Sequence, residues 1–137
     1  MSGTALAKAA HELVGCPFRL HGRDPATGID CLGLVLLALD RIGRPARLGG
    51  DYAMRMQSIT ALARQAGGLG FSAAVGPWLA GDVVLFTPGL HQHHLAIADG
   101  PTLLIHAHAG LGRVVVSPPS PEWECIGLWR LTQIERK

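Results

Sequence analysis

Residues 18–42 read FRLHGRDPATGIDCLGLVLLALDRI, a polar stretch that passes abruptly into an almost unbroken apolar one. Glycine and proline punctuate residues 18–30, which are therefore expected to form a loop. Residues 31–42 are apolar on nearly every side, a composition typical of a buried helix, and Gly43 would end that helix. Asp30 occupies the N-cap position, where a carboxylate can accept a hydrogen bond from the first helical turn. The segment thus predicts a loop that leads into a central helix.

Two other segments carry apolar side chains at helical spacing. The first covers residues 4–14, with Ser2 or Thr4 as its N-cap. The second covers residues 51–66, with Asp51 as its N-cap and two glycines directly after it. Helices are therefore expected to dominate the first half of the chain.

Beyond residue 80 the pattern changes to short β-rich runs divided by Gly, Pro and Asp turns. It predicts strands at residues 82–86, 94–98, 103–107, 113–117 and 126–131. Helices followed by an antiparallel meander indicate an α+β fold. Because no linker divides the chain, a single domain over residues 1–137 is expected.

Composition argues against several classes of protein. Of the 137 residues, 48% are hydrophobic and 16% are charged, so the chain can build a core. The net charge of +2 is spread without a basic run, which argues against a nucleic-acid partner. The longest apolar run, residues 32–39, is far shorter than the roughly 20 residues of a membrane span. Residues 1–13 lack the apolar core of a secretory leader, so we expect a soluble chain made in the cytoplasm.

Cys31 is the strongest candidate for chemistry. It opens the predicted buried helix, where the positive helix end and the backbone N–H groups stabilise a thiolate. The same N–H groups can hold a developing oxyanion. The other two cysteines, Cys16 and Cys125, form no close pair with it, which argues against a disulfide scaffold. The alternative is an ordinary buried cysteine, the commonest role of a single cysteine.

The positions of the histidines favour the interpretation of Cys31 as a nucleophile. Five of the seven fall within residues 91–108, in the stretches HQHHLAIADG and LLIHAHAG, whose predicted strands are joined by a turn at Gly100. In a hairpin centred on Gly100, His94 and His106 would face each other across the strands. A base with an orienting partner is what a cysteine nucleophile needs.

A metal site is the competing interpretation of the same histidines. His91 and His93 form one i, i+2 pair, and His106 and His108 form another. Four imidazoles could bind Zn²⁺, although no HExxH sequence accompanies them. A surface hairpin that is merely rich in histidine is the third possibility.

Four motifs, in the same order and over about residues 5–131, resemble those of the NlpC/p60 cell-wall cysteine peptidases. They are GCPFRLHGRDPATGIDCLGLV at 15–35, AGDVVLF at 80–86, HLAIADG at 94–100 and IHA at 105–107. The resemblance implies a papain-like α+β fold, in which the nucleophile helix packs on an antiparallel sheet. It also implies hydrolysis of an amide bond in peptidoglycan stem peptides, often the γ-D-glutamyl–diamino-acid bond.

The resemblance assigns roles to individual residues. Cys31 would be the nucleophile, His94 the general base and His106 the residue that orients it, with no cofactor and no metal. Substrate contacts would come from Phe18, Asp30, Leu32 and His93.

Two substrate positions depart from the family pattern. Phe18 replaces a tyrosine and Leu32 replaces a serine, so two groups that help to bind a free stem-peptide amine are missing. We therefore expect a preference for stem peptides still attached to the glycan or cross-linked.

The variant LHGRDPATGIDCLGLV at residues 20–35 most resembles the phage-type branch, found in tails of phages, prophages and gene-transfer particles. It implies assembly with tail proteins and action on the cell wall, which the particle itself reaches. The alternatives are a structural tail-assembly module with little catalysis and a metal-binding protein with a histidine cluster.

Overall fold

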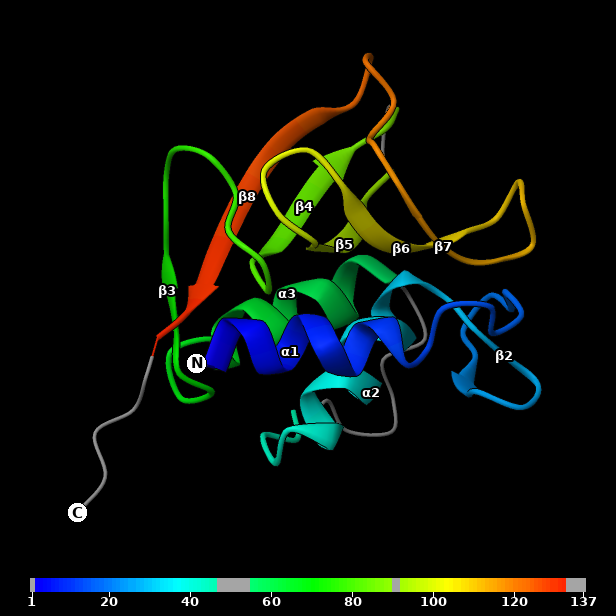
Figure 1. Ribbon diagram of the computed structural model, residues 1–137, viewed down its shortest axis with the longest axis horizontal. Coiled ribbons are helices and arrows are strands. Elements are labelled where there is room, and N and C mark those ends of the chain that lie inside the picture. The colour runs from blue at the N-terminus through cyan, green and yellow to red at the C-terminus, as the bar shows by residue number, and fades with distance from the viewer. Residues whose placement is uncertain (1, 47–54, 90–91, 133–137) are drawn as a thin grey trace.

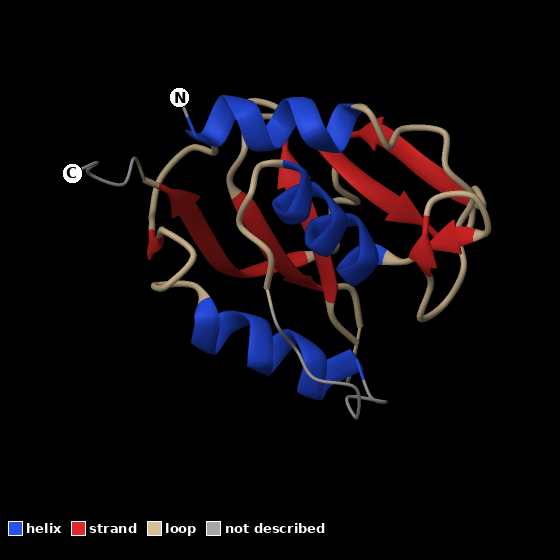
Figure 2. Ribbon diagram, turned by 90° about the horizontal axis from the view of Figure 1, so that it is seen from below, coloured by secondary structure: helices blue, strands red, loops and turns tan. Residues whose placement is uncertain are grey.

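The computed structural model describes residues 2–46, 55–89 and 92–132. Three helices occur in these ranges, α1 (Ser2–His11), α2 (Cys31–Arg41) and α3 (Arg55–Gln65). The strands are β1 (Arg23–Asp24), β2 (Gly28–Ile29), β3 (Phe71–Ala73), β4 (Val83–Thr87), β5 (His94–Ala98), β6 (Leu104–His108), β7 (Arg113–Ser117) and β8 (Glu124–Leu131). The helices lie on one side of the main sheet, with α2 between α1 and α3 (Figures 1 and 2). This is the α+β arrangement expected, with the helix that begins at Cys31 packed on the strands β5 and β6.

The main sheet is antiparallel, with strand order β3-β8-β4-β5-β6-β7. The meander predicted from the sequence holds for β4 to β7, but it is wrong for β8, which returns to pair with β4. The physical reason lies in β4, whose residues 83–86 are all buried. A strand buried on both faces lies inside a sheet and needs a neighbour on each side. The two neighbours of β4 are β5 on one side and β8 on the other.

Most other boundaries agree with the sequence pattern. β5 and β7 have the expected bounds, whereas β4 and β6 begin one residue later than predicted. The first helix starts at Ser2, so Thr4 lies within it and is not its N-cap. The sequence pattern missed β3 and the two-residue strands of the β1–β2 hairpin, which are too short to show a period. Asp51, the expected cap of the third helix, lies outside the described residues.

Apolar side chains pack on both faces of the sheet. Between the helices and the sheet, α2 buries Leu32, Leu34, Val35, Ala38 and Leu39 against side chains that include Leu95, Ile97 and Ile105. The opposite face carries a second cluster of Val84, Phe86, Ala96, Ala98 and Leu104, covered by Trp78, Trp123 and Leu128. Alternate residues of β4 and β5 therefore face opposite cores. None of the helices in the described ranges is long and apolar enough to cross a bilayer.

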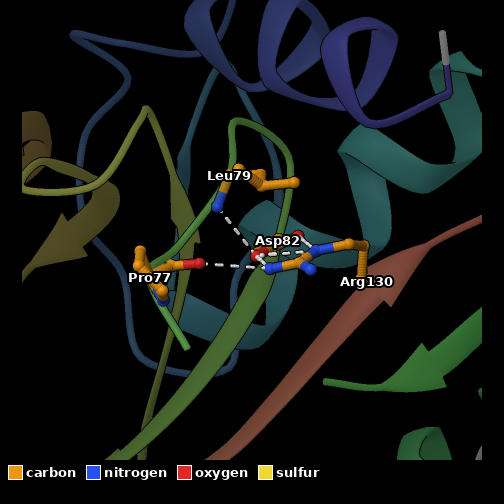
Figure 3. Close-up of polar contacts among 4 residues, drawn as sticks. All are labelled: Pro77, Leu79, Asp82 and Arg130. Carbon is orange, nitrogen blue, oxygen red and sulfur yellow. Dashed lines mark hydrogen bonds and ion pairs between the residues drawn. The ribbon is translucent and has the colours of Figure 1, made fainter. Parts of the chain in front are cut away.

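A buried ion pair ties β4 to β8. Asp82 is 1% exposed, and its Oδ2 accepts hydrogen bonds from the backbone N–H of Leu79 at 2.9 Å and from Arg130 Nη2 at 2.8 Å. Arg130 Nε donates to Oδ1 at 3.0 Å, and Nη2 also donates to the carbonyl of Pro77 at 3.2 Å (Figure 3). Arg130 therefore holds the loop before β4 against the last strand of the chain.

Candidate active site

The loop before Cys31 is fixed by Asp30. Asp30 is the N-cap of α2, and its Oδ1 accepts a hydrogen bond from the backbone N–H of Gly33 at 2.8 Å. It also accepts from Arg23 Nη1 at 2.9 Å, while Oδ2 accepts from the backbone N–H of His21 at 2.9 Å. With 1% exposure and both oxygens engaged, the carboxylate acts within the fold. Its effect is to set where Cys31 starts the helix.

A glycine lets this loop approach the helix. A Cβ at Gly33 would collide with the carbonyl oxygen of Gly22, so any side chain there would displace the loop. The close approach brings the cationic Arg23 to Asp30 beside the helix start. The sequence CLGL therefore carries a packing requirement as well as helix-forming residues.

A cavity of about 230 Å³ opens beside Cys31. Its walls come from the start of α2, from β5 and β6, and from loop residues at positions 18, 88, 109–110 and 123. Ionisable side chains around it are Cys31, His94, His106 and His108, and its remaining walls are Phe18, Pro88, Trp123 and residues 107 and 109–110. No carboxylate is among these lining residues.

The two histidines proposed from the sequence are hydrogen-bonded to each other. His94 Nε2 lies 2.8 Å from His106 Nδ1, and His106 Nε2 lies 2.7 Å from the hydroxyl oxygen of Ser117. One line of hydrogen bonds therefore crosses β5, β6 and β7. Because Nε2 of His94 is engaged by His106, Nδ1 is the ring nitrogen of His94 that this hydrogen bond does not use.

The predicted register of this hairpin was wrong, yet its face assignment was right. Ile97 pairs with Ile105 and Ala98 with Leu104, so opposed residue numbers sum to 202 rather than 200. The turn is longer than expected because the N–H of Asp99 donates to the carbonyl of Leu103 at 2.8 Å. A shift of two residues leaves every side chain on its original face of the sheet. His94 and His106 therefore still meet, as diagonal rather than directly opposed neighbours.

His106 is held neutral by its surroundings. It is 1% exposed, and burial is the larger cause that lowers its pKa from 6.5 to about 4, followed by the charge that His108 carries when protonated. At neutral pH the ring therefore has one protonated nitrogen and one acceptor nitrogen. Such a ring accepts one of its two hydrogen bonds, to His94 and Ser117, and donates the other.

We expect this pKa to make the fold sensitive to acid. The folded-state value of about 4 lies below the ordinary 6.5, so between these values the unfolded chain binds more protons and stability falls as the pH falls. At pH 4.5 the loss from this one group is on the order of 2 kcal/mol relative to pH 7.5. Urea unfolding at both pH values should show that His106→Gln lacks this component. Equal pH dependence in the two proteins would contradict the assignment.

Trp123 covers the histidine pair from the side of the second core. Its ring centroid lies 4.9 Å from that of His94 and 5.8 Å from that of His106, both in edge-to-face contact. Phe86 lies on the other side, 5.5 Å from Trp123. An aromatic ring excludes water from the imidazoles and is attracted to an imidazolium when one forms.

The structure brings together some of the residues proposed from the sequence and not others. Phe18, Cys31, His94 and His106 line the cavity. Leu32, Asp30 and His93, all within the described ranges, are not among its lining residues. Leu32 is buried in the core between α2 and the sheet, because one residue along a helix turns the side chain by about 100°. The argument that Leu32 removes a polar group from the substrate site is therefore wrong.

Two residues of the site escaped the sequence analysis. Ser117 ends a strand that was predicted correctly, and the β6–β7 register pairs His106 with Val115, which places Ser117 diagonal to His106 on the same face. The signal for this was the tight AGLG turn at residues 109–112. Trp123 lies in an irregular segment before β8, where the sequence shows no periodic pattern.

The metal interpretation finds little geometric basis in the described ranges. Within them, no group of three or more His, Cys, Asp or Glu residues could hold a metal ion. His91, one of the four histidines in that hypothesis, lies outside these ranges.

Comparison with solved structures agrees with this fold. The NlpC/p60 domain of the peptidoglycan hydrolase SagA is similar, with 27% identity, a TM-score of 0.61, and coverage of 86% of this chain and 90% of that one. NlpC2 from Trichomonas vaginalis has 19% identity and a TM-score of 0.69 over 94% of this chain, which spans only 46% of that protein. The P60 domain of an antigen from M. avium subspecies paratuberculosis has 21% identity and a TM-score of 0.60, over 97% of this chain and 96% of that one.

No curated protein matches the sequence. The model of the NlpC/P60 family, in contrast, matches residues 15–126. This range contains Cys31, His94, His106 and Trp123. This match extends over well more than half of the chain, which therefore belongs to the NlpC/P60 family.

Proposed function

We propose that residues 1–137 form one cysteine peptidase domain that hydrolyses an amide bond in peptidoglycan stem peptides. The observation that carries the proposal is the cavity in which Cys31, at the start of α2, meets the hydrogen-bonded pair His94 and His106. Membership of the family and the likeness to the SagA domain, which belongs to a peptidoglycan hydrolase, support the substrate class.

The proposed reaction uses His94 in both its acylation and its deacylation half. Cys31 gives its proton to Nδ1 of His94, and the sulfur attacks the amide carbonyl, so that a C–S bond forms and the oxygen becomes an oxyanion. We assign the oxyanion to the N–H of Cys31 at the positive end of α2. The imidazolium then protonates the leaving amine as the C–N bond breaks. Water, deprotonated by His94, attacks the thioester and restores the thiol.

We propose the γ-D-glutamyl–diamino-acid bond as the one cleaved, because the motifs around Cys31 and His94 are those of the family. Digesting purified peptidoglycan and analysing the fragments by mass spectrometry tests this directly. Cleavage there creates a free glutamyl carboxyl and a free α-amine on the diamino acid. New termini at another bond would reject the bond assignment, and no new termini would reject the proposed function.

The lining of the cavity predicts a choice between two forms of substrate. An ammonium group that loses water without gaining a carboxylate costs several kcal/mol. Among the lining residues that the structure describes there is no carboxylate, and Phe18 has no hydroxyl to offer. We therefore expect intact sacculi to be cleaved at least about tenfold faster than amidase-released stem peptides at matched peptide concentration, a difference of about 1.4 kcal/mol.

Phe18→Tyr is the matched variant for this comparison, because it adds one hydroxyl to the cavity wall. We expect it to raise the relative rate on the released peptides. Faster cleavage of released peptides by the unmodified protein would contradict the prediction.

We propose further that the chain acts on the wall as part of a phage or gene-transfer-particle tail. The support is the sequence LHGRDPATGIDCLGLV at residues 20–35, which resembles the phage-type branch. Mass spectrometry of particles purified from a producing culture should find the chain with tail proteins. Its absence from pure, infectious particles would reject this location.

A further inference from the structure

The direction of the hydrogen bonds through His106 decides whether His94 can act as a base. His94 must keep Nδ1 unprotonated to take the thiol proton, so its own proton must sit on Nε2. That proton can be donated only if Nδ1 of His106, 2.8 Å away, is an acceptor. A neutral His106 with an unprotonated Nδ1 carries its proton on Nε2, which faces Ser117 at 2.7 Å.

The opposite direction is chemically unproductive. If Ser117 donated to Nε2 of His106, the proton of His106 would sit on Nδ1 and point at His94. His94 would then accept on Nε2 and carry its proton on Nδ1, where it could not receive the thiol proton. The two arrangements use the same distances and differ in whether the hydroxyl of Ser117 accepts or donates, since a serine hydroxyl can do either.

We propose that Ser117 is a positioning residue, whose hydroxyl oxygen accepts the Nε2 proton of His106 and so fixes the tautomer that lets His94 act as base. This inference rests on the proposed function, since it assigns Ser117 a part in that reaction. Ser117 is not itself among the residues that line the cavity, and it acts through His106, which is.

The surroundings of His106 favour this role. The ionisable groups that face the ring are His94 from β5 and His108 from its own strand, with Ser117 on β7 and the ring of Trp123 above. Its pKa of about 4 keeps the ring of His106 neutral at neutral pH. A neutral ring has two tautomers of similar energy, so a hydroxyl that accepts from Nε2 favours the tautomer protonated there.

Threonine and valine at position 117 provide a matched pair, because they share a shape and differ in the hydroxyl. Loss of a partner that fixes an imidazole tautomer costs about 10- to 100-fold at metal sites. We expect Ser117→Val to lower kcat on peptidoglycan by a factor in that range, with KM little changed. In Ser117→Thr, which keeps the hydroxyl, kcat should stay within about threefold of the value for the unmodified protein. Equal losses in both variants would overturn the proposal.

A second background separates positioning from mere structural support. In His106→Asn, the amide oxygen can accept the hydrogen bond from His94. An amide has no tautomers to be selected, so the variant does not depend on a hydrogen bond from position 106 to Ser117. Adding Ser117→Val to His106→Asn should therefore change kcat less than about threefold. A further loss as large as in the unmodified background would show that Ser117 only supports the fold.

The proton positions can be measured without any substrate. In protein labelled with ¹⁵N-histidine, two-bond proton–nitrogen spectra distinguish protonated from unprotonated ring nitrogens. We expect His106 to be protonated on Nε2 in the unmodified protein and in Ser117→Thr, and to gain the Nδ1 tautomer in Ser117→Val. A proton on Nδ1 of His106 in the unmodified protein would overturn the proposal. If the spectra are as expected but the protein does not cleave peptidoglycan, the proposed proton arrangement is supported and only the proposed function is rejected.

Discussion

Cys31→Ser and His94→Ala are each expected to lower the rate of stem-peptide release from purified peptidoglycan by at least about 10⁴-fold. Serine keeps the size and place of Cys31, but a hydroxyl is a far weaker acid than a thiol, and His94 cannot deprotonate it as readily. In the proposed reaction, His94→Ala removes the group that takes the thiol proton and passes it to the leaving amine. The rate is measured as new amine termini per unit time.

The controls for this experiment lie in the same chain. Cys125 is exposed and is not among the residues that line the cavity, so Cys125→Ser should leave the rate unchanged. Cys31→Ser combined with His94→Ala should be no slower than either variant alone, because the two groups act as a unit. His106→Ala should be milder, since it removes an orienting group and not a reacting one. Activity that survives Cys31→Ser but is lost in EDTA would instead favour the metal hypothesis.

Local sequence signals were sufficient for the centre of the fold. Asp30 was recognised as an N-cap because a carboxylate at that place satisfies an N–H of the first turn, and α2 begins directly after it. The bounds of β5 and β7 followed from short, largely apolar runs separated by turn residues. In each case the residues that determine the structure lie within a few positions of one another.

What the sequence did not reveal depends on contacts between distant segments. Nothing near Arg130 indicates that its partner is Asp82, 48 residues earlier, or that β8 inserts beside β4. Leu32 was placed in the substrate site by its position next to Cys31, and it lies in the core because the helix turns. His94 and His106 were found in spite of a wrong register, because a shift of two residues preserves the face.

Arg130→Met is expected to destabilise the protein by about 3 kcal/mol, the largest loss of stability that we expect from a single substitution outside the cavity. The carboxylate of Asp82 is 1% exposed, and Arg130 supplies three of its short contacts, at 2.8, 3.0 and 3.3 Å. Methionine keeps much of the apolar stem and leaves the buried charge without its partner. The free energy of unfolding in urea measures the effect.

The cost should come from the unpaired charge and not from the missing arginine. Asp82→Asn removes that charge and keeps an oxygen for the N–H of Leu79, so the double variant should be more stable than Arg130→Met alone. Arg64→Met, an exposed change on α3, should alter stability by less than about 0.5 kcal/mol. If Arg130→Met were no less stable than Arg64→Met, the pair would not hold β8 to β4. Because β8 and β5 flank β4 on its two sides, loosening β8 should also disturb the strand that presents His94 to Cys31.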